Sequence, residues 1–183
     1  MPDNQTFFPA LETERLILRS LEDGDAEFIF KHFSDPTVTQ HLLDSPPMSK
    51  RSEAIDLIAF YRTRERHGPN RWGIVTRSDN SVIGTCGFHN WAPRHHRAEI
   101  GYDLSPHAWG HGFMTEALRL ILAHGFKDMS LNRIDAFVFG ENEKSIRLLE
   151  KFGFEAEGVL RDYFCFNGTF YDHRLYSLLK TDV

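Results

Sequence analysis

Residues 105–118 have the sequence Ser-Pro-His-Ala-Trp-Gly-His-Gly-Phe-Met-Thr-Glu-Ala-Leu, and they join a strand pattern to a helix pattern. Before them, Ile100, Tyr102 and Leu104 alternate with other residues, which is typical of a strand with one buried face. After them, small and apolar residues follow helical spacing at Met114, Ala117, Leu118, Ile121, Leu122 and Gly125. The pattern therefore places Gly110 and Gly112 at a helix N-terminus.

Glycines at a helix N-terminus favour a bound anion. The first four amide N–H groups of a helix have no partner within it, and the helix dipole places partial positive charge at the same end. Gly110 and Gly112 have no Cβ to hold a ligand away, and they tolerate backbone angles that turn several amides toward one point. This predicts a phosphate or pyrophosphate site. The other interpretation is a strand-to-helix turn that needs only a flexible backbone.

Two common phosphate motifs do not fit this stretch. A P-loop has Gly-Lys-Ser/Thr after its glycines, but Gly112 is followed by Phe113 and Met114. A dinucleotide fingerprint needs a third small residue where Thr115 lies, inside strand-helix-strand repeats. Neither context is present.

The stretch His107-Ala-Trp-Gly-His-Gly112 resembles the Gln/Arg-x-x-Gly-x-Gly/Ala signature of the GNAT superfamily of N-acetyltransferases, whose loop holds the pyrophosphate of acetyl-CoA. Three further stretches, in family order, are similar to the RimJ/RimL-type branch, which acetylates the N-termini of ribosomal proteins. They are residues 11–19, 109–117 and 142–154. The resemblance runs from about Leu11 to Leu178.

The order of the expected elements is a strand, two helices, three strands, a helix, a strand, a helix and two strands, which indicates an α+β protein. The expected strands cover residues 11–21, 71–77, 82–90, 98–104, 133–139, 159–166 and 169–179, with loops at 37–47 and 91–97. Asp23–Asp25, Ser49 and Asn142 are expected to cap helices, the helix after Ser49 ending near Gly68–Pro69, and Asn167-Gly168 to form a hairpin turn. Gly84 and Gly87 predict bulges or close backbone approach.

The resemblance implies a GNAT acyl-CoA N-acyltransferase fold, with a central mixed, mostly antiparallel sheet of about seven strands flanked by four helices. We expect one domain over residues 1–183, with residues 1–10 as an N-terminal extension.

The charge and cysteine content of the sequence indicate which classes of partner and which cellular compartment to expect. The 21 basic and 26 acidic residues give a net charge of −5, which disfavours nucleic acid and weakly favours amine-bearing partners. Cys86 and Cys165 are expected to be free thiols in the core, in a reducing compartment. No leader pattern or apolar run of membrane-spanning length occurs, so we expect a cytoplasmic protein that binds no membrane. The residues leave the oligomeric state open, although members of the resembling family often pair as homodimers.

The resemblance implies that acetyl-CoA binds and that the amine attacks it directly in a ternary complex, without an acyl-enzyme. The backbone of residues 102–104 would lie beside the pantetheine arm. The expected cofactor contacts are Tyr102, Asp103, Leu104, His107, Trp109, Gly110, His111, Gly112, Phe113, Met114, Thr115, Asn142 and Ser145. For Trp109 the other assignment is the core.

Four side chains are candidates for catalysis or acceptor binding. Ser145 is the proposed proton donor to the leaving sulfur in the resembling branch, and Asn142 matches a family cofactor contact that can also cap a helix. Glu99 either deprotonates the amine or forms a salt bridge, for example to Arg97. Asp172 either meets the ammonium group of the substrate or is an exposed or paired aspartate.

The sequence departs from the wider family at two positions. Leu149 occupies the place of a tyrosine general acid, and Phe164 replaces a glutamate found in the final hairpin of some RimL-type members. The ten histidines, including His89, His95 and His96, show no metal-ligand spacing, so no metal is expected. The prediction is an acetyl-CoA-dependent N-acetyltransferase acting on the α-amine of a protein or peptide. The alternatives are acetylation of a small amine, such as a polyamine, amino sugar or antibiotic, and a non-catalytic acyl-CoA-binding module.

Overall fold

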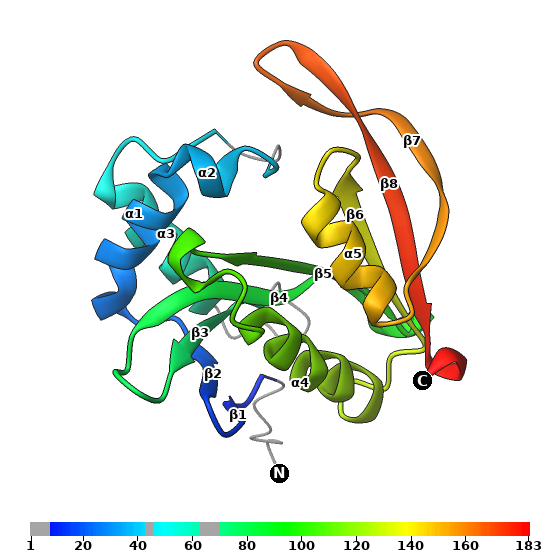
Figure 1. Ribbon diagram of the computed structural model, residues 1–183, viewed down its shortest axis with the longest axis horizontal. Helices are drawn as coiled ribbons and strands as arrows, with labels where there is room; N and C mark the ends of the chain where they lie inside the picture. The colour runs from blue at the N-terminus through cyan, green and yellow to red at the C-terminus, as the bar shows by residue number, and fades with distance from the viewer. Residues whose placement is uncertain (1–7, 43–45, 63–69) are drawn as a thin grey trace.

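A computed structural model describes residues 8–42, 46–62 and 70–183, which form a single mixed sheet with helices packed around it (Figure 1). The order of its eight described strands is β1-β2-β3-β4-β5-β6-β8-β7, and every neighbouring pair is antiparallel except β5 and β6. The strands are β1 (Leu11–Glu12), β2 (Leu16–Ser20), β3 (Trp72–Thr76), β4 (Val82–Ala92), β5 (Arg97–Leu104), β6 (Arg133–Phe139), β7 (Glu155–Phe166) and β8 (Thr169–Leu179). This confirms the expected α+β class, with one strand more than the seven expected.

The described α-helices number five, one more than expected. They are α1 (Ala26–Ser34), α2 (Pro36–Thr39), α3 (Arg51–Arg62), α4 (Phe113–Lys127) and α5 (Glu143–Lys151). The extra helix is α2, which begins at Pro36 and extends into the loop expected at residues 37–47. The Asp35 carboxylate accepts a hydrogen bond from the Thr37 amide at 2.8 Å, and Pro36 occupies the first helical position, where its missing N–H costs nothing.

The prediction of one continuous strand over residues 11–21 is wrong, because this stretch forms two strands, β1 and β2. The Thr13 amide donates to the Leu16 carbonyl, and the Leu16 amide donates to Thr13 Oγ1, both at 2.9 Å, so the chain turns between the two strands. The expected alternation survives in β2, where Leu16 and Leu18 are fully buried and Ile17 is not.

Two expected N-caps also differ. Asp23–Asp25 forms a short 3-10 helix before α1, and the Asp25 carboxylate accepts hydrogen bonds from Arg19 and from the Glu22 amide instead of capping α1. Ser49 lies before the start of α3, and its hydroxyl donates to the Glu53 carboxylate at 2.8 Å. The expected end of this helix near Gly68–Pro69 lies outside the described residues.

The strand ends differ from expectation at two further places. The expected loop at 91–97 is shorter, because β4 continues to Ala92 and a 3-10 turn at Pro93–His95 follows it. β7 begins at Glu155, four residues earlier than expected. The Asn167-Gly168 turn is confirmed, with positive φ angles of 49° and 78°.

Two glycines of β4 allow close backbone approach, as expected. A Cβ on Gly84 would lie 2.4 Å from the Asp103 carbonyl oxygen, and one on Gly87 would lie 1.9 Å from the Asn70 carbonyl oxygen. Any side chain there would push β4 away from its neighbours.

The parallel pair β5 and β6 opens the sheet. Their pairing covers Arg97–Glu99 with Arg133–Asp135, and beyond it the two strands diverge (Figure 1). β5 leads into α4, while β6 leads into α5. The apolar face of α4 is buried against the sheet as its spacing predicted. The fold therefore holds the starts of two helices on opposite sides of one opening.

Candidate active site

The glycines between β5 and α4 adopt the backbone that their sequence predicted. Gly110 and Gly112 have φ angles of 78° and 77°, in the left-handed region that favours glycine. Gly112 is the N-cap residue of α4, and it has no side chain to occupy the first amides of the helix. A Cβ at Gly110 would meet nothing within 4 Å, so this stretch faces open space. The start of α4 is thus available to an anionic ligand.

A cavity of about 700 Å³ lies at this point, between α4, α5 and the end of β5. Its size falls in the range of small-molecule sites. The predicted cofactor residues that line it are Tyr102, Asp103, Leu104, Trp109, Gly110, Gly112, Phe113, Met114, Thr115, Asn142 and Ser145. We call it the cofactor cavity.

His107 and His111 do not belong to this lining. His107 is exposed, while the His111 ring stacks on Phe113 with centroids 5.8 Å apart. Both residues lie between β5 and α4, and the resemblance to the family motif did not indicate which side chains of this stretch face the cavity.

Trp109 forms part of the cavity wall and is not a core residue. Its Nε1 donates to the Leu104 carbonyl at 2.7 Å, and Lys144 Nζ lies 3.8 Å from the centre of its ring. The indole therefore connects the end of β5 with the first turn of α5 across the opening.

A second cavity of about 490 Å³ lies on the other side of the divergent strands. Glu99 and Asn90 line it from the β4–β5 side, and Phe137 and Phe139 line it from β6. We call it the acceptor cavity. The residues common to both cavities are His41, Leu42, Tyr102, Asn142 and Ser145. The two spaces therefore meet.

A pair of hydroxyl groups lies where they meet. Tyr102 Oη is 2.7 Å from Ser145 Oγ, and Asn142 Oδ1 accepts a hydrogen bond from the Ser145 amide at 3.2 Å. Asn142 thus caps α5, as its position predicted. Burial, partly offset by the bond to Ser145, raises the pKa of Tyr102 to about 12, so the phenol keeps its proton at neutral pH.

Glu99 is partly buried in the wall of the acceptor cavity. Its carboxylate accepts a hydrogen bond from Asn90 Nδ2 at 3.0 Å, so its described partner is Asn90 and not Arg97. Burial raises the pKa of Glu99; Asn90 opposes this and Asp135 adds to it. A carboxyl group with a raised pKa is a better proton acceptor than an ordinary one.

Sequence reasoning missed Arg71 and two histidines of the acceptor cavity. Arg71 Nη1 lies 3.3 Å from His89 Nε2, and burial followed by the Arg71 charge lowers the pKa of His89 to about 4. Burial also lowers the pKa of His41. Both imidazoles are therefore neutral at pH 7. No local spacing signals this group, because its members come from three separate parts of the chain.

Asp103 contributes its side chain to a buried network behind the cofactor cavity. It forms an ion pair with Arg71, its Oδ1 lies 2.7 Å from His32 Nε2, and it accepts hydrogen bonds from the Thr85 amide and hydroxyl. His32 Nδ1 in turn lies 2.9 Å from Ser105 Oγ. The side chain of Asp103 is thus engaged within this network, and the backbone contact expected of residues 102–104 stays a prediction.

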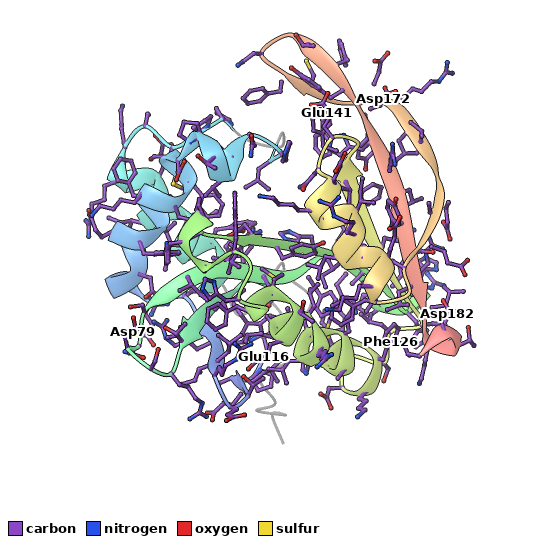
Figure 2. The ribbon with its side chains drawn as sticks, viewed as in Figure 1. Asp79, Glu116, Phe126, Glu141, Asp172 and Asp182 are labelled. Atoms are coloured by element: carbon purple, nitrogen blue, oxygen red, sulfur yellow. The ribbon has the colours of Figure 1, made fainter. Side chains whose placement is uncertain are left out.

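The remaining predicted residues lie elsewhere. Asp172 is exposed on the projecting part of β8 (Figure 2), is not among the residues that line either cavity, and accepts a hydrogen bond from the Asp162 amide at 2.9 Å. Cys86 is buried as expected, but the core assignment of Cys165 is wrong because it is exposed on β7. Leu149 is fully buried in the core.

Within the described ranges, no group of three or more His, Cys, Asp and Glu side chains is placed to hold a metal ion. Among the same residues, no helix has the length and apolar character needed to cross a bilayer.

The sheet opens between two parallel strands, and a helix N-terminus and two joined cavities lie at the opening, an arrangement that can bring an anionic cofactor and a second substrate together. Residues 15–155 match the family model of the acetyltransferase (GNAT) domain. The chain therefore belongs to the GNAT family, and it is an N-acetyltransferase.

Known proteins resemble the chain over nearly its whole length. It is 47% identical over 176 residues to an uncharacterized N-acetyltransferase of Bacillus subtilis, YoaA, covering 94% of this chain and 98% of that one. It is 28% identical to the [ribosomal protein uS5]-alanine N-acetyltransferase of Escherichia coli, over 94% of this chain and 91% of that one. The solved spermidine N-acetyltransferase of Vibrio cholerae, in complex with CoA and spermine, superposes with a TM-score of 0.82 at 25% identity, covering 93% of this chain and 98% of that one.

Proposed function

We propose that the chain transfers an acetyl group from acetyl-CoA to the α-amine of a protein or peptide by direct attack in a ternary complex. The observation that carries this proposal is the meeting of the two cavities at the Tyr102–Ser145 pair. A thioester that enters from the cofactor cavity and an amine that enters from the acceptor cavity would come together there. Positioning of this kind supplies much of the rate enhancement for an activated acyl group.

Each proposed role follows from the side chain's position. The amides of residues 110–115 bind the pyrophosphate, and an amide of β5 polarises the thioester carbonyl. Glu99 accepts a proton from the substrate ammonium, directly or through water, and the neutral amine that results attacks the thioester carbonyl to form the new C–N bond. The C–S bond breaks, and Ser145 donates a proton to the departing sulfur while Tyr102 holds its hydroxyl. Asn142 fixes the turn that presents Ser145.

The charges in the acceptor cavity support an amine with a single positive charge. Glu99 is the one carboxylate among the described residues that line this cavity, and the Arg71 guanidinium also faces it. A polyamine would need several acidic groups spaced along the site. The similarity to the uS5-alanine enzyme also favours an α-amine acceptor.

Two measurements test the proposal. Calorimetry should give tighter binding of CoA than of dephosphorylated pantetheine, and equal or absent affinity for both would contradict the pyrophosphate site. Thiol release from acetyl-CoA should be faster with a peptide panel than with spermidine, amino sugars or aminoglycosides. CoA binding without turnover on any amine would indicate a non-catalytic binding module.

A further inference from the structure

The acceptor cavity has an aromatic wall that the transfer chemistry does not require. Phe137 and Phe139 contribute from β6, Tyr163 and Phe164 from β7, and His173 from β8. The Phe137 and Tyr163 rings stack with centroids 5.2 Å apart, and the Phe164 and His173 rings lie 4.6 Å apart. These rings line an open space, so they can contact whatever the acceptor carries beside its amine.

A bulge in β7 makes this wall possible. Neighbouring residues of a regular strand point to opposite faces, yet Tyr163 and Phe164 both line the cavity. The pairing of β7 with β8 shifts between Leu160 and Phe164, so residues 161–163 lie opposite Asp172 alone. The extra residues bend the strand and change the direction of its side chains, as a β-bulge does.

Asp172 holds this bulge. Its carboxylate accepts a hydrogen bond from the amide of Asp162, whose φ of 52° lies in the left-handed region. Residues other than glycine are uncommon in this region, although aspartate adopts it more readily than most. The exposed carboxylate therefore acts on the cavity through the backbone that presents Tyr163 (Figure 2 shows Asp172 on the projecting hairpin).

The base and the aromatic wall face the same space. Glu99 and Tyr163 both line the acceptor cavity, and burial, followed by the Glu99 charge, raises the pKa of Tyr163. An ammonium group beside Glu99 would thus have aromatic faces next to it, and these attract both cations and apolar groups.

We propose that the acceptor carries an aromatic or large apolar group next to its amine, as in a peptide whose first residue is phenylalanine or leucine. Tyr163 and Phe164 select that group, and Asp172 is a positioning residue for them. This inference rests on the proposed α-amine acetylation and adds the chemical class of the first side chain.

The test uses peptides that differ only in their first residue: phenylalanine, leucine, alanine, serine or aspartate. At saturating acetyl-CoA, kcat/KM for the phenylalanine or leucine peptide should exceed that for alanine by about tenfold or more, as expected for burial of an apolar side chain in a matching pocket. Equal values, or a preference for serine or aspartate, would overturn the inference.

Variants locate the preference in the wall. Tyr163→Ala and Phe164→Ala should remove most of it by raising KM for the phenylalanine peptide while sparing the alanine peptide. Phe164→Leu keeps a large apolar side chain at this position, so it controls for loss of folding in the alanine variant. The control is Phe170→Ala, on the same hairpin but 60% exposed and outside the cavity lining. Phe164→Leu should therefore keep most of the preference, and a preference that persists in both alanine variants would contradict the role of the wall.

Asp172 is tested with two replacements. Asp172→Asn keeps an oxygen that can accept the Asp162 hydrogen bond, so it should preserve the preference, while Asp172→Ala should weaken it. If the carboxylate met the substrate ammonium instead, both variants would lose activity alike, which would overturn the positioning role.

Small amines separate this inference from the function on which it rests. If no peptide is acetylated, the α-amine proposal fails, and phenethylamine is then compared with spermidine. Faster turnover of phenethylamine supports the aromatic wall, whereas faster turnover of spermidine, or none with either amine, overturns it.

Discussion

The proposed role of Glu99 as a base depends on its position on β5, where burial raises the pKa of its carboxyl group. As a base it must be deprotonated, so kcat/KM should fall as the pH falls through this raised pKa. Glu99→Gln should lower kcat by about 100-fold and abolish that limb of the pH–rate profile. Stopped assays of thiol release from acid to neutral pH check both effects.

The matched control for Glu99 is Glu155→Gln, an exposed carboxylate at the start of β7. It should keep the activity and pH profile of the wild type. A Glu99→Gln variant with wild-type kcat would exclude Glu99 as the base.

The Tyr102–Ser145 pair should behave as one unit. Tyr102→Phe and Ser145→Ala each remove one partner of the 2.7 Å contact, and each should lower kcat by about tenfold or more. Because either change disables the same donor, the double variant should be little worse than the single ones. Ser52→Ala, on the exposed surface of α3, is the control. Simple multiplication of the two single effects would show that the hydroxyls act separately.

At the scale of elements, the junction of β5 and α4 depends on left-handed glycine backbone. Gly112→Ala leaves room for the Cβ, whose nearest described neighbour would be Arg15 Nη2 at 3.7 Å, but its φ of 77° is costly for alanine. We expect a loss of about 1 kcal/mol in unfolding free energy and weaker CoA binding. Urea unfolding and calorimetry measure the two effects. Gly24→Ala has free space and no positive φ, so it should change neither.

The Asp103 network joins α1 to β4 and β5, so its loss should affect the whole sheet. Asp103→Asn leaves Arg71 as a buried cation without its counter-charge, and we expect a destabilisation of about 3–5 kcal/mol. Urea unfolding measures this, with Asp56→Asn on the exposed face of α3 as the control. A loss no larger than that of the control would show that the ion pair is dispensable.

The same network predicts an acid limit. Burial alone raises the pKa of Asp103, but Arg71, followed by His32 and Thr85, outweighs it and lowers the pKa below its ordinary 3.8. A lowered folded-state pKa gives stability that is fully present above the ordinary value and is lost as the pH falls below it. Unfolding free energies measured from pH 6 downward should therefore decline below about pH 4 in the wild type and less steeply in Asp103→Asn.

At the scale of the whole molecule, bound CoA should contact both sides of the opening and stabilise them together. One side ends in α4 and the other in α5, and their strands share only a short parallel pairing. At 100 times its dissociation constant, CoA should add about 2.7 kcal/mol to the unfolding free energy. Hydrogen exchange should slow at the starts of both α4 and α5. Protection confined to one helix would contradict a ligand that spans the opening.

The elements that could be predicted are those whose signals lie in neighbouring residues. The helix from Phe113, the cap at Asn142 and the hairpin at Asn167-Gly168 each depend on local spacing or turn chemistry, and each is confirmed. The strand interrupted at Thr13 and the helix begun at Pro36 were missed, because single hydrogen bonds of side chains decided them.

The amino-acid sequence by itself determined the class of fold, the glycine-rich start of α4 and most of the residues that line the cofactor cavity, because their signals lie in short runs of neighbouring residues. Only the tertiary structure decided what surrounds the acceptor. It brought Tyr102 to Ser145, Arg71 to Asp103, and Tyr163 beside Phe137. These partners are far apart in sequence, and they meet because of strand pairing, the divergence of two parallel strands and a bulge in β7, none of which a local sequence pattern reveals.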